Sequence, residues 1–223
     1  SNVTFQAGVN LGLAYTLSDK ADTVIGTELA DTTVAGEGND TLTLGDGADI
    51  ITGDDGADII DVGADTDVDT VIYVAKLDGG VSGDAADTTI STAGADVITN
   101  FDSGVDKLDM NGEFLQATMA TTSVAAVNEV GYAGGIDFDG LGTGDDVAQL
   151  IAAGAKTATA ADLLTVADLN AAVGTITNEA QGDERILVFN AQDGSSVMYL
   201  YTSATADDAI TADELQLLAV IDE

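Results

Sequence analysis

Aspartates recur every nine residues through the first third of the chain, a spacing that could build a row of metal sites. The register holds six of them: Asp22, Asp31, Asp40, Asp49, Asp58 and Asp67. In the three central copies, a glycine stands two residues before the aspartate and an aliphatic residue two residues after it, as in the stretch 47–51. So strict a period indicates a repeating structural unit.

The pairing of glycine with aspartate indicates oxygen ligands for a cation. Glycine adopts backbone angles that other residues avoid, so its carbonyl can point at an ion. Calcium takes about 6–8 oxygen ligands. We therefore expect calcium, as several ions, at these residues: Asp22, Asp31, Gly36, Gly38, Asp40, Gly45, Gly47, Asp49, Gly53, Gly56, Asp58 and Asp67.

Two repeats are expected to make one coil of eighteen residues, with a short strand on each of two faces. Asp22, Asp40 and Asp58 then stack on one edge of the coils, and Asp31, Asp49 and Asp67 stack on the other. Stacked carboxylates about 4.8 Å apart repel one another. A calcium ion between neighbouring turns would turn that repulsion into attraction.

A metal-free alternative remains open, in which the aspartates only shape the turns, as Asp and Asn commonly do. That reading accounts for aspartate at the turns. It does not account for the glycine two residues earlier, or for the scarcity of lysine.

One residue of each repeat is expected to face the interior, because side chains alternate along a strand. The expected interior set is Val24, Thr33, Leu42, Ile51 and Ile60. In the sixth repeat this position falls on Asp69. The register is therefore predicted to break there, with Val71 taking over after a small insertion.

The charge and composition of the chain limit its partners. The 40 acidic and 5 basic residues give a formal charge of −35, which argues against nucleic acid and against anionic membrane surfaces. There is no apolar run long enough for a transmembrane helix, so membrane insertion is not expected. Self-repulsion at this charge favours a bound cation.

The composition also limits the chemistry. Without histidine or cysteine, zinc sites, thiolate nucleophiles and Ser-His-Asp triads are excluded, and the remaining oxygen ligands suit hard cations. A glycosidase-like carboxylate pair is possible by residue type, but aromatic residues make up only 4% of the chain. We expect no catalysis by this chain.

At this point the stretch 36–61 resembles the glycine-rich nonapeptide repeat of the RTX (repeats-in-toxin) family. A second stretch, 94–110, is similar to the segment that follows the roll in serralysin-type C-terminal domains. Its matching residues are Asp96, Ile98, Phe101, Gly104, Asp106, Lys107, Leu108 and Asp109. The resemblance implies a calcium-bound parallel β-roll, export by the type I secretion machinery, and folding outside a Gram-negative cell.

The resemblance and the residue patterns together predict a mainly β fold: a parallel β-roll with a C-terminal β-sandwich-like cap and a small helical insertion. The expected parts are an N-terminal strand or cap (1–21), the roll (22–75), a roll-capping segment (76–112), the insertion (113–180) and a C-terminal hairpin with the secretion-signal region (181–223). The chain ends in apolar and then acidic residues, whereas many family members end in the reverse order.

Local patterns in the last two parts predict individual elements. Helices are expected at about 145–153 and 160–173, a hairpin at 186–201 around an Asp-Gly turn, and a strand after Glu214. A short helix capped by Thr211 and Glu214 is the alternative to the start of that strand. The acidic loop with Asp137, Asp139 and Asp145 could hold a further calcium ion or be a flexible loop.

Two functions remain open at this stage. The first is the calcium-binding and secretion module of a surface structural protein, such as an S-layer protein, an adhesin or a filament subunit, with self-assembly or cell-surface polysaccharide as possible partners. The second is the same module on a secreted hydrolase whose catalytic domain lies outside this chain. The richness in Ala, Thr and Asp favours the first.

Overall fold

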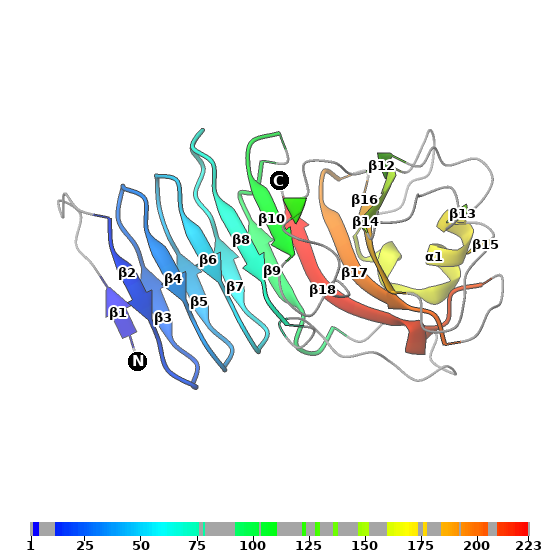
Figure 1. Cartoon of the computed structure of the whole chain (residues 1–223), viewed down its shortest axis with the longest axis horizontal. Helices are drawn as coiled ribbons and strands as arrows, with labels where there is room; N and C mark the ends of the chain where they lie inside the picture. The colour runs from blue at the N-terminus through cyan, green and yellow to red at the C-terminus, as the bar shows by residue number, and fades with distance from the viewer. Residues whose placement is uncertain are drawn as a thin grey trace. The chain divides into compact units, whose positions relative to one another are not determined.

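The structure is a computed structural model that describes residues 2–4, 12–75, 78, 92–102, 104–110, 122–123, 128–129, 136–137, 147–151, 160–173, 176–177, 184–191, 193–204 and 209–222 (Figure 1). The chain divides into two compact units. The first comprises Ser1–Gly80, Ala93–Ala125 and Ile221–Glu223, and the second comprises Val81–Thr92 and Ala126–Val220.

The first unit is a roll of short strands that alternate between two sheets. One sheet takes the odd strands, in the order β1 (Asn2–Thr4), β3 (Thr23–Ile25), β5 (Thr41–Thr43), β7 (Ile59–Asp61) and β9 (Asp96–Thr99). The other takes β2 (Ala14–Thr16), β4 (Thr32–Val34), β6 (Ile50–Thr52), β8 (Thr70–Tyr73), β10 (Lys107–Met110) and β11 (Thr122–Ser123). In Figure 1 these strands lie side by side, and their colour runs from blue to green along the chain.

The pairing between coils is parallel and follows the expected period. Val24 pairs with Leu42 and Leu42 with Ile60 in one sheet, so each step along the sheet is one coil of eighteen residues. Strand β11 is the exception, because it pairs antiparallel with β10. This parallel β-roll confirms the predicted fold class.

The interior of the roll is the predicted set of residues, one from the middle of each strand. Val24, Thr33, Leu42, Ile51 and Ile60 are all fully buried. Strand β2 already pairs with β4 in this register, with Tyr15 opposite Thr33. The residues before Asp22 therefore contribute strands to the roll.

A second interior position, which the sequence reasoning missed, lies four residues after the aspartate. Ala35, Leu44 and Val62 occupy it and are fully buried. Gly26 and Gly53 take this position in the other two repeats, so three of the five repeats bury a second apolar side chain, which adds to the apolar area that holds neighbouring coils together.

The predicted break in the register is present. Strand β8 follows an insertion, so that Ile51 pairs with Val71 twenty residues later. The stretch 94–110 then resumes the coil, with Ile60 opposite Ile98 in one sheet and Val71 opposite Leu108 in the other. This stretch extends the roll by another coil.

The second unit contains one sheet with the strand order β12 (Asn128–Glu129), β14 (Val147–Ile151), β16 (Glu184–Asn190), β17 (Ser196–Thr202) and β18 (Leu215–Asp222). Its other elements are β13 (Ile136–Asp137), β15 (Ile176–Thr177), α1 (Val166–Val173) and the 3₁₀ helices η3 (Asp162–Leu164) and η4 (Ala212–Glu214). Its core includes Phe189 and Tyr199, whose rings meet edge to face at 5.9 Å.

The predicted hairpin is confirmed, because β16 and β17 pair antiparallel across a turn in which Gly194 has a φ of 92°. Both alternatives at the C-terminus are also present: Thr211 and Glu214 form a capping box on η4, and the strand β18 follows it. The helix expected at 160–173 is present as η3 and α1.

The helix expected at 145–153 is wrong. Residues 147–151 form strand β14, which pairs parallel with β16, with Val147 opposite Ile186. A short apolar run of this kind fits a buried strand as well as a helix, and its partner strand lies far along the chain. Asp139 and Asp145 of the acidic loop lie outside the described residues.

Candidate metal centre

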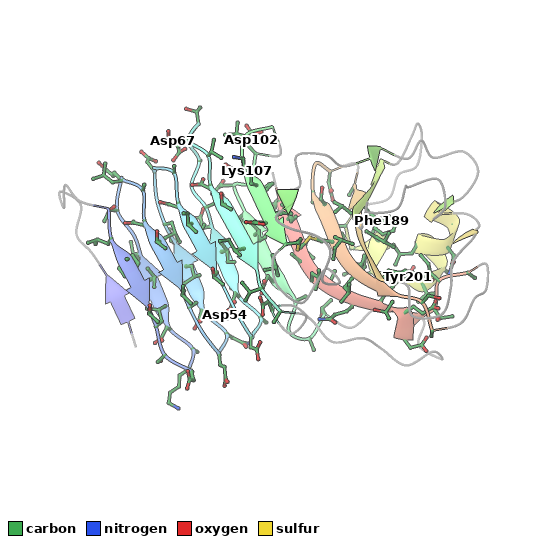
Figure 2. The ribbon with its side chains drawn as sticks, viewed as in Figure 1. Asp54, Asp67, Asp102, Lys107, Phe189 and Tyr201 are labelled. Atoms are coloured by element: carbon green, nitrogen blue, oxygen red, sulfur yellow. The ribbon has the colours of Figure 1, made fainter. Side chains whose placement is uncertain are left out.

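The repeated aspartates form two columns, one along each edge of the roll. The first column holds Asp22, Asp40, Asp58 and Asp96. The second holds Asp31, Asp49, Asp69 and Asp106. Figure 2 labels Asp54, in the turn that leads to Asp58 of the first column, and Asp67, which lies at the opposite edge of the roll.

In every aspartate of the two columns except Asp22, Oδ1 accepts a backbone N–H from the neighbouring coil. The backbone N–H of Asp31 donates to Oδ1 of Asp49 at 2.7 Å, and the N–H of Asp49 donates to Oδ1 of Asp69 at 2.8 Å. In the other column, the N–H of Asp40 donates to Oδ1 of Asp58 at 2.8 Å. The Oδ1 atoms therefore accept hydrogen bonds from backbone N–H groups in the turns, which have no partner in the strand pairing.

The second oxygen of the central aspartates has no hydrogen-bond partner in the part of the chain that the structure describes. Oδ2 of Asp40, Asp49 and Asp58 is buried and accepts no hydrogen bond from the described part of the chain. An unpaired buried carboxylate oxygen is costly, because water no longer solvates its charge. These three atoms are where a cation fits the structure.

Burial raises the pKa of these carboxyl groups. Desolvation raises the pKa of Asp40 to about 6 and that of Asp49 and Asp58 to about 7, with nearby carboxylates adding to the shift of the last two. Desolvation likewise raises the pKa of Asp96 to about 8. Without a cation, the central aspartates thus take up protons close to neutral pH.

In the turns before Asp40, Asp49 and Asp58, the residue four before the aspartate has a left-handed backbone conformation. These residues are Gly36, Gly45 and Asp54, with φ values of 87°, 99° and 61°. Space at the turns is also restricted. A Cβ on Gly53 would lie 2.3 Å from Oδ2 of Asp58, one of the three unpaired oxygens. The glycine leaves a cradle beside that oxygen.

The backbone of one turn lies close to that of the next. A Cβ on Gly45 would lie 2.2 Å from the carbonyl oxygen of Thr27, and a Cβ on Gly63 would lie 2.0 Å from that of Gly45. Carbonyl oxygens of successive turns are thus stacked beside the carboxylates. Within the described ranges no three acidic side chains converge, so carbonyls would have to complete the shell of about 6–8 oxygens around a calcium ion.

The position of Asp67 in the second column was predicted wrongly. The insertion after Gly63 moves the column to Asp69, which is buried, while Asp67 is exposed and its N–H donates to Oδ1 of Asp65. Asp96 and Asp106 were not among the predicted site residues. Like Asp69, each stands two residues before a buried aliphatic residue, a signal that could have identified all three.

Comparison with known proteins agrees with this geometry. Residues 18–42 and 34–69 match the family described as the RTX calcium-binding nonapeptide repeat (4 copies). No curated protein matches the chain. Within the described ranges, no helix is both long and apolar enough to cross a membrane.

The match covers the coils that hold the three unpaired carboxylate oxygens. RTX repeats bind several calcium ions. Residues 18–69 therefore match a segment of RTX calcium-binding repeats, and in this structure they form part of a parallel β-roll.

Proposed function

We propose that this chain is an extracellular module whose β-roll remains unfolded at the low calcium concentration of the cytosol and folds on calcium after type I secretion. It belongs to a larger structural protein of a Gram-negative cell surface, such as an S-layer protein, an adhesin or a filament subunit. Asp40, Asp49 and Asp58, together with turn carbonyls, hold the ions.

The unpaired Oδ2 atoms of the central aspartates carry this proposal. Closing the roll buries them, so folding without a cation forces each aspartate to take up a proton or leave a charge unsolvated. The −35 charge of the chain adds general repulsion to this local cost. Binding free energy at sites that the unfolded chain lacks becomes folding free energy.

A calcium titration from a calcium-free start, followed by far-UV circular dichroism, tests the folding step, with magnesium as the control cation. We expect a cooperative gain of β signal at about 10⁻⁴–10⁻³ M calcium, the range typical of extracellular modules. Magnesium should give no such gain, since it demands a smaller octahedral shell and dehydrates reluctantly. A roll already folded without calcium at pH 7.5, with no gain of β signal on adding calcium, would refute the proposal.

The surface role rests on composition, because a chain rich in Ala, Thr and Asp and without His or Trp resembles surface-layer and adhesin sequences. Antibody labelling of intact cells that express the full-length protein checks it. We expect the label on the cell exterior, dependent on the type I exporter. Label confined to the culture medium would count against a surface role.

A further inference from the structure

The turns of the roll are of two kinds, and the residue four before each aspartate distinguishes them. In the central turns this residue is Gly36, Gly45 or Asp54, and its φ is positive. In the first two turns it is Ser18 or Thr27. Neither is among the residues with positive φ in the described part of the chain. Both carry a hydroxyl group.

Thr27 supplies hydrogen bonds to Oδ2 of Asp31, the oxygen that has no partner from the described chain in the central aspartates. Its backbone N–H donates to Oδ2 of Asp31 at 2.7 Å, and its Oγ1 lies 3.1 Å from the same oxygen. Oδ1 of Asp31 accepts the N–H of Leu13 at 2.7 Å. Groups of the chain itself therefore satisfy both carboxylate oxygens of Asp31.

Ser18 repeats this arrangement one turn earlier. Its N–H donates to Oδ2 of Asp22 at 3.0 Å, and its hydroxyl donates to the same oxygen at 2.7 Å. The equivalent oxygen of Asp40, in the next turn of that column, is buried without a partner. Where the residue four before the aspartate is Ser or Thr, Oδ2 of that aspartate accepts hydrogen bonds. Where it is a residue with positive φ, Oδ2 has no partner in the described chain.

The other end of the roll is closed in a similar way. The Tyr73 hydroxyl donates to Oδ2 of Asp96 at 2.8 Å, and the N–H of Asp102 donates to Oδ2 of Asp106 at 2.8 Å. The unpaired Oδ2 atoms of Asp40, Asp49 and Asp58 therefore lie between end aspartates whose Oδ2 atoms all accept hydrogen bonds: Asp22, Asp31, Asp96 and Asp106.

We propose that calcium is confined to the central coils, and that Ser18 and Thr27 take the place of the ion at Asp22 and Asp31. This inference rests on the proposed function and departs from the expectation that Asp22 and Asp31 are metal ligands. The roll then has metal-independent ends and a metal-dependent centre.

The chain offers a gain-of-site variant to test this. Thr27→Gly with Leu29→Gly converts residues 26–31 to Gly-Gly-Glu-Gly-Ala-Asp, the glycine pattern of the central turns. Leu29 stands where those turns have Gly38 and Gly47, so the new glycines permit the left-handed turn. Thr27→Ser is the matched control, because it keeps the hydroxyl.

We expect the double variant to bind one more calcium ion per chain than the wild type, measured by equilibrium dialysis with elemental analysis. The Thr27→Ser control should bind the wild-type number. A double variant that folds in calcium yet binds no additional ion would overturn the inference.

Asp31→Asn decides the question if the double variant does not fold. The asparagine keeps one acceptor oxygen and removes the charge. We expect the number of bound ions to match the wild type, whereas the loss of an ion would show that Asp31 is a ligand. Failure of the wild type itself to bind calcium would instead refute the proposed function, so the two failures are distinguishable.

Discussion

The two oxygens of a central aspartate have different environments. Oδ1 of Asp49 accepts the N–H of Asp31 and holds two coils together, while Oδ2 is buried with no donor from the described chain. A change that removes only the charge therefore separates the structural contact from the metal contact.

Asp49→Asn is such a change, because the amide oxygen can still accept the N–H of Asp31. We expect the calcium midpoint for folding to rise by about tenfold, which corresponds to about 1.4 kcal/mol. Asp46→Asn, in the same turn but exposed, makes the same charge change and is the control. An equal effect of both variants would mean that net charge matters and the site does not.

The raised pKa values of the central aspartates predict an unusual pH dependence without calcium. Desolvation raises their pKa from 3.8 to about 6 for Asp40 and about 7 for Asp49 and Asp58. The folded chain then binds more protons than the unfolded chain, so the free energy of unfolding falls as pH rises from about 4 through 7.

Thermal unfolding in calcium-depleted buffer at pH 5, 6, 7 and 8 measures this dependence. We expect the melting temperature of the roll to be highest at pH 5 and lower at pH 6, with no melting transition at pH 8, where the calcium-free roll is unfolded. In saturating calcium the fall should disappear, since the bound cation stabilises the ionised carboxylates. A melting temperature that rises with pH in calcium-depleted buffer would contradict the buried, unpaired state of these groups.

At the scale of the strand, Thr33 is a polar residue in an apolar position. It lies at the middle of β4, fully buried, and its Oγ1 has no hydrogen-bond partner in the described structure. Thr33→Val removes the unsatisfied hydroxyl while keeping the β-branched shape.

We expect Thr33→Val to raise the free energy of unfolding in saturating calcium by about 1 kcal/mol, measured by urea denaturation. Thr32→Val, on the exposed face of the same strand, controls for the change in β-propensity. A destabilised Thr33→Val chain would show that its hydroxyl has a partner in solution.

The sequence predicted the coils well where the repeat is regular. The interior residues from Val24 to Ile60 follow directly from the period of nine. The prediction failed at Asp67, because an insertion shifts the column by two residues while an aspartate still occurs at the regular position. Local sequence does not show which of two nearby aspartates reaches the column.

Strand β14 marks a second limit of prediction from sequence. Its parallel pairing with β16 joins residues nearly forty positions apart, such as Val147 and Ile186. This long-range pairing overrides a local pattern that also fits a helix. The unpaired oxygens at Asp40, Asp49 and Asp58 likewise depend on which donors the folded turns supply, and the sequence alone does not reveal that.

At the scale of the molecule, the two compact units differ in how their buried acidic groups are satisfied. The buried Glu214 of the second unit accepts hydrogen bonds from the N–H groups of Ala204 and Thr211. Among the described residues, the unpaired buried carboxylate oxygens lie in the first unit. Calcium should therefore act mainly on the first unit.

Hydrogen exchange with mass spectrometry, with and without calcium, resolves the two units. We expect peptides from 41–61 to lose most of their protection on calcium depletion, and peptides from 196–202 to lose much less. Equal loss in both regions would mean that calcium controls folding of the whole chain as one cooperative unit.

The most direct test of the account is an anomalous diffraction experiment on crystals grown in about 10 mM calcium, well above the 10⁻⁴–10⁻³ M typical of extracellular sites. The account predicts anomalous density beside Oδ2 of Asp40, Asp49 and Asp58. Density that is absent from these three positions in a folded roll would contradict it.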